Sequence, residues 1–364
     1  MGDHSGGQSG PSRVDMDDVA AAVTACGYRF LRGPGRLLLP WEAHRVLIHV
    51  GRADARVLIA ETELRRTLDL SEINALARTI TAWNAGRINP TALLSVTDSG
   101  EVSVRFRVSL PVDAGATEEQ LRSFIRSAMQ ATELAVDHML NEFPGLRTGG
   151  GTEPAEDVLD VEALHRPFPS RTAGDGPDDG HEGAEIMAEP DEPGEPAEDR
   201  DISDGVNSNA GGDIDLPDPD SPTPVDLARL ESTLEDLGIH GMHRGESWLA
   251  TTVNRVLIGL HLDNGPSLIL RGLWDPDLDP EQDFMRLFLC CNTWNERSAL
   301  TKAYCHTDDD GLQVRVEMSV PTVAGLTPTQ LRHTVSLGLR RVLLAVGSIS
   351  EDVTGDSVVD WPED

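Results

Sequence analysis

The tetrapeptide Arg45-Val46-Leu47-Ile48 recurs 210 residues later as Arg255-Val256-Leu257-Ile258. The pair Trp83-Asn84 recurs as Trp294-Asn295, and Thr117 with a following Leu121 recurs as Thr327 with Leu331. One tetrapeptide is compatible with chance. Matching apolar, turn and capping signals in the same order indicate a tandem duplication, so the function should be sought in what two copies of one module can do.

Composition divides the chain between the two copies. Residues 149–224 hold 22 Asp and Glu against three Arg, a net charge of 3 − 22 = −19 out of −32 for the whole chain. A stretch with so little apolar surface cannot offset its ordering entropy, so we predict that it is disordered. We predict a disordered start over 1–14, a first domain over 15–145, an acidic disordered linker over 146–223, a second domain over 224–352 and an acidic C-terminal tail over 353–364.

Charge and apolar content exclude several classes of protein. Lys302 is the only lysine, and a strongly acidic chain without a basic block is unsuited to nucleic acid. No apolar run reaches the length of a membrane span, and the first residues carry no secretory signal. Four cysteines in 364 residues are not a disulfide framework. We therefore expect a cytoplasmic protein that contacts neither nucleic acid nor membrane.

Both copies give the same coarse pattern of secondary structure. An amphipathic helix ending near Gly27 or Gly238 precedes short β-branched stretches, a second helix ending near Trp83 or Trp294, two strands and a final helix capped by Thr117 or Thr327. The last strand alternates apolar residues with Arg105 and Arg107, or with Arg315 and Glu317, which predicts one buried face and one wet face. The fold class is α+β, with each domain α-β-β-β-α-β-β-α and its helices on one antiparallel sheet.

The second copy resembles a known family. It has Cys291-Asn292-Thr293-Trp294-Asn295, then Thr301-Lys302-Ala303-Tyr304, and a strand ending at Pro321 before the capped helix. This order resembles a YbjN domain of the actinobacterial kind, a family similar in fold to type III secretion chaperones. The first copy is divergent, because Thr81 stands in place of Asn292 and Thr91 in place of Lys302. The resemblance implies peptide or protein binding, chaperone-like or regulatory, without chemistry.

Seven residues are candidates for contact with a polypeptide or partner protein: Trp83, Asn84, Asn292, Trp294, Asn295, Lys302 and Tyr304. In one interpretation each Trp anchors the core at a helix end and the following Asn caps that end in left-handed geometry. In the other, the aromatic ring and the amide lie at the rim of a groove and bind an extended peptide backbone.

The sequence shows no signature of catalysis or of a metal or cofactor site. His240 and His243 have a metal-ligand spacing without a second ligand pair, and Cys291 stands where the first copy has Ile80, as a small core residue would. There is no phosphate-binding loop, nucleophile elbow or dinucleotide fingerprint. We expect no catalytic residue, no metal and no cofactor.

The main hypothesis is a non-enzymatic protein- or peptide-binding module, chaperone-like or regulatory, whose two domains act as a tethered pseudo-dimer on a polypeptide client. Intramolecular pairing and homodimerisation both remain open. The alternative is a small-molecule-sensing signalling regulator, which would need an enclosed cavity with converging polar groups, whereas a peptide binder needs an open groove.

Overall fold

The computed structural model describes residues 10–52, 55–147, 221–263, 267–308 and 311–361. Both repeats belong to one unit of the structure, which spans 1–170 and 219–364. The predicted linker falls almost entirely outside the described residues, as does most of the predicted disordered start. The tail predicted over 353–364 begins inside the last helix, and Val359 within it is buried.

The first repeat begins with a helix, continues with strands and ends with a long helix. Its elements are α1 (Met16–Ala25), β1 (Leu31–Gly33), β2 (Arg36–Pro40), β3 (His44–Arg52), β4 (Arg56–Leu64), β5 (Leu68–Asp69), η1 (Leu70–Glu72), α2 (Ile73–Gly86), β6 (Thr91–Val96), β7 (Glu101–Pro111), α3 (Glu118–Glu142) and η2 (Pro144–Leu146).

The second repeat follows the same order. Its elements are α4 (Leu227–Asp236), β8 (His243–Arg244), β9 (Trp248–Val253), β10 (Val256–Asp263), β11 (Ser267–Leu278), α5 (Phe284–Arg297), β12 (Lys302–Asp308), β13 (Gly311–Pro321) and α6 (Pro328–Thr354). The predicted α+β class and the duplication are confirmed. Each repeat has more strands before its second helix than the predicted order, because the short β1 and β8 pair at the outer edge of a sheet and the first repeat adds the two-residue β5.

Each repeat has one antiparallel sheet. Among the described residues the first sheet runs β1-β2-β3-β4-β7-β5, with β6 also paired to β7, and the second runs β12-β13-β11-β10-β9-β8. The strands β6 and β12 are therefore edge strands, each hydrogen-bonded on one side only. An edge strand leaves backbone groups unpaired, so something else must satisfy them.

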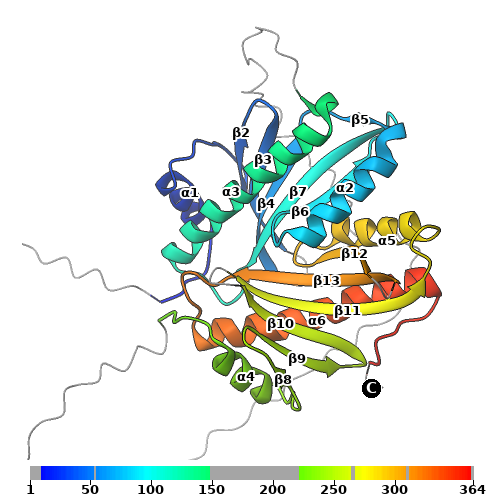
Figure 1. Cartoon of the computed structure of the whole chain (residues 1–364). Coiled ribbons are helices and arrows are strands. Elements are labelled where there is room, and N and C mark those ends of the chain that lie inside the picture. The colour runs from blue at the N-terminus through cyan, green and yellow to red at the C-terminus, as the bar shows by residue number, and fades with distance from the viewer. Residues whose placement is uncertain (1–9, 53–54, 148–220, 264–266, 309–310, 362–364) are drawn as a thin grey trace, which may run out of the picture. The chain divides into compact units, whose positions relative to one another are not determined.

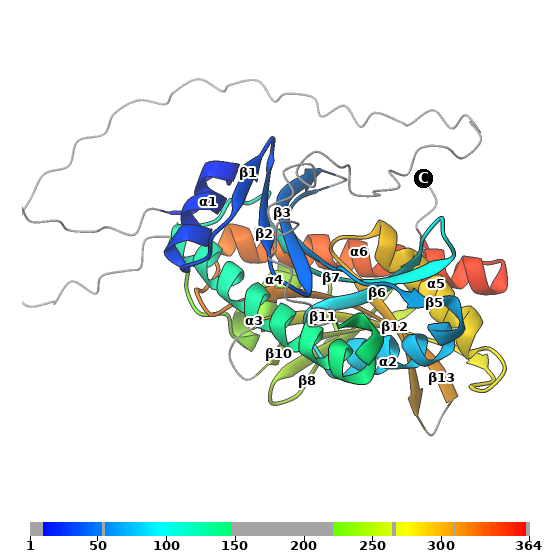
Figure 2. The same cartoon turned by 90° about the horizontal axis from the view of Figure 1, so that it is seen from above.

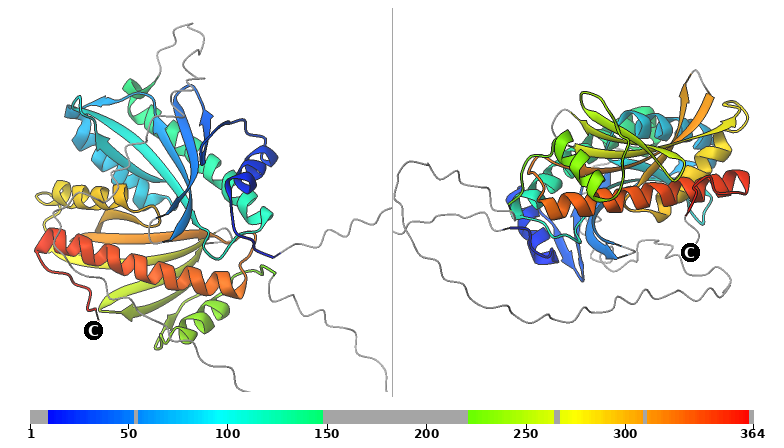
Figure 3. Two further views of the ribbon diagram at one scale, coloured as in Figure 1. Left: turned by 180° about the vertical axis from the view of Figure 1, so that it is seen from behind. Right: turned by 90° about the horizontal axis from the view of Figure 1, so that it is seen from below.

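The long helices cover one face of each sheet. In Figure 1, α3 crosses the first sheet and α6 crosses the second, where it packs against β11 and β13. Figure 2 shows α1 beside α3, and the left view of Figure 3 shows the length of α6 along its sheet. The shorter helices α2 and α5 contact each other, and each also contacts the edge strand of the other repeat. One hydrophobic cluster contains most core residues of both repeats, and a smaller one joins Leu337 of α6 to Val57 and Ile59 of β4.

The predicted end signals of the helices are present. Thr117 and Thr327 each form a capping box with the glutamine three residues later. Gly27 and Gly238 follow α1 and α4 with φ of 85° and 78°, a conformation that favours glycine. Asp69 caps the short η1 helix, which leads directly into α2.

The repeated tetrapeptide lies on corresponding strands but at different registers. In the first repeat Leu47 lies opposite Glu61 on β4. Their counterparts in the second repeat are Leu257 and Arg271, but there Arg271 lies opposite Gly259, which is two residues further along β10. Arg255 lies outside β10 in a tight turn with a φ of 68°. A shift of two residues keeps every side chain on its own face, so the isoleucines and the first valines of both copies remain buried.

We predict that Thr327→Ala lowers the free energy of unfolding by about 1 kcal/mol, because the backbone N–H of Gln330 at the start of α6 loses its acceptor. Thr329→Ala is the control, since Thr329 is exposed in the same turn. Chemical denaturation measures both, and an equal loss in the two variants would contradict the capping role.

A second prediction concerns His44, which is buried and stacked on Trp41 with neither ring nitrogen hydrogen-bonded. Burial, with help from Arg65, lowers the pKa of His44 from 6.5 to about 4. Between these values the unfolded chain binds a proton that the folded chain does not, so His44 destabilises the fold as pH falls from 6.5 to 4.

We therefore expect His44→Gln to lose less stability than the natural chain across that window, by up to about 3 kcal/mol. Denaturation at a series of pH values measures the difference, and the exposed His243→Gln serves as control. Parallel curves for His44→Gln and the natural chain would refute the assignment.

Candidate functional site

The seven predicted contact residues gather where the two repeats meet. They lie on α2, α5 and β12, and all are buried except Trp294, which is half-buried. An outside polypeptide cannot reach most of them while the repeats are in contact. Their hydrogen-bond partners are instead other groups of this chain, mostly backbone groups.

Asn84 and Asn295 each bind the backbone of the strand that follows their own helix. Asn84 donates to the carbonyl of Ala92 at 2.9 Å and accepts from its N–H at 2.8 Å. Asn295 makes the same pair with Ala303, at 2.8 and 2.7 Å. The capping interpretation is therefore wrong, because α2 and α5 continue beyond both asparagines. The amides bind extended backbone, but that backbone is β6 or β12.

The two tryptophans anchor the ends of the same helices. The indole N–H of Trp83 donates to the carbonyl of Pro90 at 2.9 Å, and that of Trp294 donates to the hydroxyl of Thr301 at 2.8 Å. Trp83 also stacks on His138 of α3. Both rings thus fix the connection from the helix to the following strand.

Asn292 crosses from the second repeat to the first. Its amide accepts from the N–H of Leu94 at 3.0 Å and donates to the carbonyl of the same residue at 2.9 Å. These are backbone groups on the open side of the edge strand β6. The counterpart Thr81 has a buried hydroxyl without a hydrogen-bond partner. Asn292 of the second repeat therefore binds the edge strand of the first repeat, and its counterpart Thr81 makes no equivalent hydrogen bond to the second repeat.

Lys302 also crosses to the first repeat. Its ammonium donates to the carbonyls of Asn84 at 2.8 Å, Arg87 at 2.6 Å and Ile88 at 3.3 Å, at the C-terminal end of α2. Helix ends leave carbonyls without intrahelical partners and carry partial negative charge, so a buried end needs a donor and favours a cation.

Arg107 of the first repeat binds the end of a helix in the second repeat. Its guanidinium donates to the carbonyls of Asn295 at 2.7 Å and Ser298 at 2.9 Å, at the C-terminal end of α5. These acceptors are the counterparts of Asn84 and Arg87. Each repeat therefore supplies one buried cation that satisfies the end of a helix in the other repeat.

Each of these cations pairs with a carboxylate of its own repeat, but the acidic and basic positions are reversed between the two sheets. Glu61 lies opposite Arg107 in the first sheet, and at the counterpart positions Arg271 lies opposite Glu317 in the second. Because Glu317 replaces an arginine, the cation of the second repeat comes from Lys302 on the neighbouring strand, 2.9 Å from Glu317.

Burial governs the ionisation of the second of these clusters. Burial lowers the pKa of Lys302, and Glu317 opposes that effect. Burial alone would raise the pKa of Glu317, but Lys302, Arg271 and the Tyr304 hydroxyl lower it below its ordinary value. Burial and Glu317 raise the pKa of Tyr304, whose hydroxyl donates to Glu317 at 2.6 Å. Tyr304 is therefore a neutral donor that supports a charged Glu317.

The strand face predicted to be wet is buried on β7 and β13. Arg105, Arg107 and Glu317 are each less than a tenth exposed, because the other repeat covers them. Arg105 bridges Glu61 at 3.2 Å and Glu296 of the second repeat at 3.1 Å. The sequence carried one signal for this, namely the reversed charges at 61 and 271 and at 107 and 317.

Two glutamines from the capping boxes meet directly. Gln120 and Gln330 donate to each other's side-chain oxygen at 2.9 Å, and each also donates to a glycine carbonyl of the other repeat, at Gly325 and Gly115. Their oxygens also accept from Thr117 and Thr327. Both amides are therefore fully satisfied. The sequence indicated the capping threonines Thr117 and Thr327 but gave no sign that the glutamines would join the two repeats.

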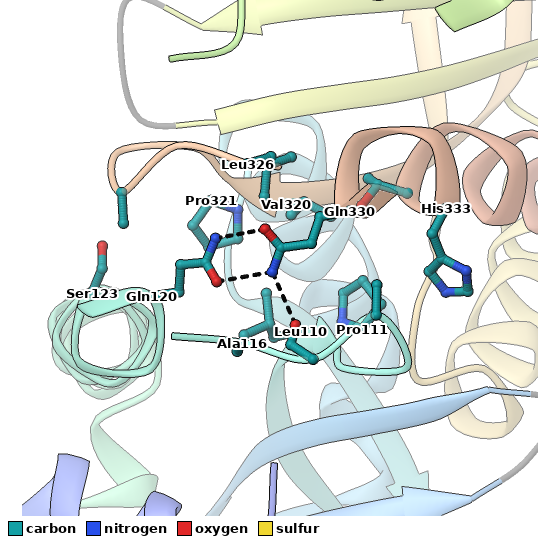
Figure 4. Close-up of a pocket in the computed structure, with 14 residues that line it drawn as sticks. Leu110, Pro111, Ala116, Gln120, Ser123, Val320, Pro321, Leu326, Gln330 and His333 are labelled. Carbon is teal, nitrogen blue, oxygen red and sulfur yellow. Dashed lines mark hydrogen bonds between the residues drawn. The ribbon is translucent and has the colours of Figure 1, made fainter. Parts of the chain in front are cut away.

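A hollow opens beside the paired glutamines. Its volume is about 480 Å³, including the solvent at its mouth, and it draws matched residues from both repeats (Figure 4). The matched lining pairs are Leu110 with Val320, Pro111 with Pro321, Ala114 with Ala324, Ala116 with Leu326, and Ser123 with His333. The surface is mainly carbon and requires both repeats.

Within the described ranges no group of three or more His, Cys, Asp or Glu could hold a metal ion. All four cysteines are free thiols. The hydrogen bond to Cys305, together with burial, raises the pKa of Cys291, which keeps this thiol protonated. None of the helices in the described ranges has the length and apolarity that a bilayer crossing requires.

Comparison with known proteins identifies the repeats. A family model described as "YbjN: Putative bacterial sensory transduction regulator" matches residues 15–141 and 226–345. No curated protein matches the chain. A solved structure titled "Crystal structure of YbjN, a putative transcription regulator from E. coli" is similar, at 21% identity and a TM-score of 0.31, over 36% of this chain and 95% of that one.

We predict that Asn292→Ala lowers the free energy of unfolding by about 1–3 kcal/mol, because the N–H and carbonyl of Leu94 lose their buried partner. Thr81→Ala, the counterpart substitution, removes an unpartnered hydroxyl and should change stability little.

The reactivity of Lys302 with an amine reagent provides a second measurement, because this is the only lysine and it is buried. Peptide mass spectrometry should show faster modification of Lys302 in Asn292→Ala than in Thr81→Ala. Equal stability and equal modification rates in the two variants would contradict a role for Asn292 in the inter-repeat contact.

Proposed function

Because this chain belongs to the YbjN family, we propose that it is a non-enzymatic regulator that binds a polypeptide partner through its two repeats, which act together as a tethered pseudo-dimer. The hollow beside Gln120 and Gln330 is the observation that carries the proposal. Neither repeat forms it alone, so a partner that binds there responds to the pair.

The lining of the hollow favours an apolar group of a polypeptide. The lining residues are mainly Leu, Val, Pro and Ala, and the two amides beside them already use all their donors on each other and on backbone carbonyls. Val323, between the lining residues Pro321 and Ala324, is 65% exposed, which extends the apolar surface beyond the hollow. Apolar surface of this kind is typical of protein contacts.

A small-molecule sensor is the second candidate. Its support is that residues of both repeats line the hollow, so a ligand bound there would respond to their pairing. The satisfied amides disfavour a polar metabolite, because they offer it no free donor. An apolar metabolite would fit the same surface, and the experiment below distinguishes it from a polypeptide.

The cytoplasm is the proposed location. Cys291 and Cys305 are buried free thiols, which suits a compartment that keeps cysteines reduced. The absence of enzymatic activity is part of the proposal, and its support is that the buried charged groups at the inter-repeat contact are occupied with one another and with helix ends.

The test places a photo-crosslinking amino acid at Val323 of the full chain in living cells, with Leu134 as control, because both side chains are well exposed. We expect protein adducts of defined mass from position 323 only. We also expect them to disappear in Ala324→Trp, which fills the hollow. A melting curve checks that Ala324→Trp remains folded.

Adducts that are equally abundant from positions 323 and 134, or unchanged in Ala324→Trp, would contradict polypeptide binding at the hollow. A small-molecule adduct at 323 with no protein adduct would favour the sensor.

A further inference from the structure

We infer that the pairing of the repeats is heterotypic: the first repeat is built to pair with the second and not with another copy of itself. This inference rests on the proposed pseudo-dimer and concerns the choice of partner at the same contact. At three positions the counterparts differ, and only one combination of repeats makes the contact.

The first such position is apolar. Leu337 of α6 is 1% exposed and belongs to a cluster with Val57 and Ile59 of β4 in the first repeat. The counterpart of Leu337 is Ser127, which is exposed on α3, and the counterpart of Val57 is Ser267. Two first repeats would therefore place a serine against Val57, and two second repeats would place Leu337 against a serine. Only the mixed pair buries both apolar side chains.

The second position is the edge strand β6. Asn292 satisfies both backbone groups of Leu94, whereas the counterpart Thr81 has a single hydroxyl in its place. A hydroxyl on a shorter side chain cannot bond an N–H and a carbonyl of one residue in this way. Two first repeats would leave the buried N–H and carbonyl of Leu94 without a partner, which is costly.

The third position is a buried arginine. Arg105 has Glu296 of the second repeat as one of its two carboxylate partners. The counterpart of Glu296 is Ala85, so a pair of first repeats would lose this carboxylate on both sides. Removing a partner from a buried charge is strongly unfavourable.

The three positions rank the combinations. A pair of first repeats loses all three contacts. A pair of second repeats places Ser267 instead of Val57 against Leu337, with Ile269 as the counterpart of Ile59, and it retains an asparagine, a glutamate and a lysine. The mixed pair keeps all of them. The heterotypic pair should therefore dominate, second-repeat pairs should be minor, and first-repeat pairs should be absent.

The experiment starts from the intact folded chain with a protease site inserted between residues 171 and 218. After cleavage, the halves are left to exchange and native mass spectrometry measures which pairs exist. We expect the complex of one first half with one second half and no pair of first halves. First-half pairs or second-half pairs as abundant as the mixed pair would overturn the inference while leaving repeat pairing intact. Halves that separate without pairing would overturn the proposed pseudo-dimer as well.

A variant tests the apolar contact directly. Leu337→Ser should weaken association of the two halves by about 10- to 100-fold. Leu344→Ser is the control, because Leu344 lies on the same helix and is 39% exposed, and it should leave association unchanged. Equal association of the two variants would refute the role of Leu337. Circular dichroism of the uncut chain checks folding, and the cleavage experiment on the natural sequence does not depend on either variant.

Discussion

Carbonyls at the C-terminal ends of α2 and α5 are bound by the opposite repeat, and much else follows from this. A buried helix end needs donors for its last carbonyls. Lys302 and Arg107 provide them across the inter-repeat contact. A buried cation in turn needs an anion, which Glu317 and Glu61 supply from the same sheets. Tyr304 and Arg271 then complete the hydrogen bonding of Glu317. The reversed charges of the two sheets and the presence of Lys302 in the second repeat alone follow from the need to pair these cations.

Such a network fixes geometry more than it adds stability. Replacing a buried ion pair by apolar groups is often neutral, whereas removing one member is costly. Apolar contact alone would allow α2 and α5 to slide across the edge strands. The carbonyl positions at each helix end leave one arrangement in which both cations are satisfied, and Asn292 fixes the same arrangement through the backbone of β6. The result is a defined register between the repeats, and the hollow beside the glutamines depends on that register.

The sequence predicted the fold well because the fold depends on local signals. The capping boxes at Thr117 and Thr327, the glycines after α1 and α4 and the period-two strands are each readable within a dozen residues. The site was predicted less well, because it depends on contacts across roughly 200 residues of sequence. Asn292, Lys302 and Tyr304 stood out as differences between the copies, but nothing local indicated that the other repeat would bury them. For the same reason the alternating arginines of β7 were interpreted as a wet face.

Identity and difference between the copies carry separate physical information. A core residue such as Ile48 or Ile258 points into the core of its own repeat in both copies, so it can stay the same. A residue beside the inter-repeat contact meets a different residue in each copy, so it can differ. The reversed charges at 61 and 271 and at 107 and 317 keep an opposite-charge pair within each sheet, Glu61 with Arg107 and Arg271 with Glu317. Gln120 and Gln330 are the exception, because each meets its own counterpart. An amide is both donor and acceptor and is therefore complementary to itself, so this position has no reason to diverge.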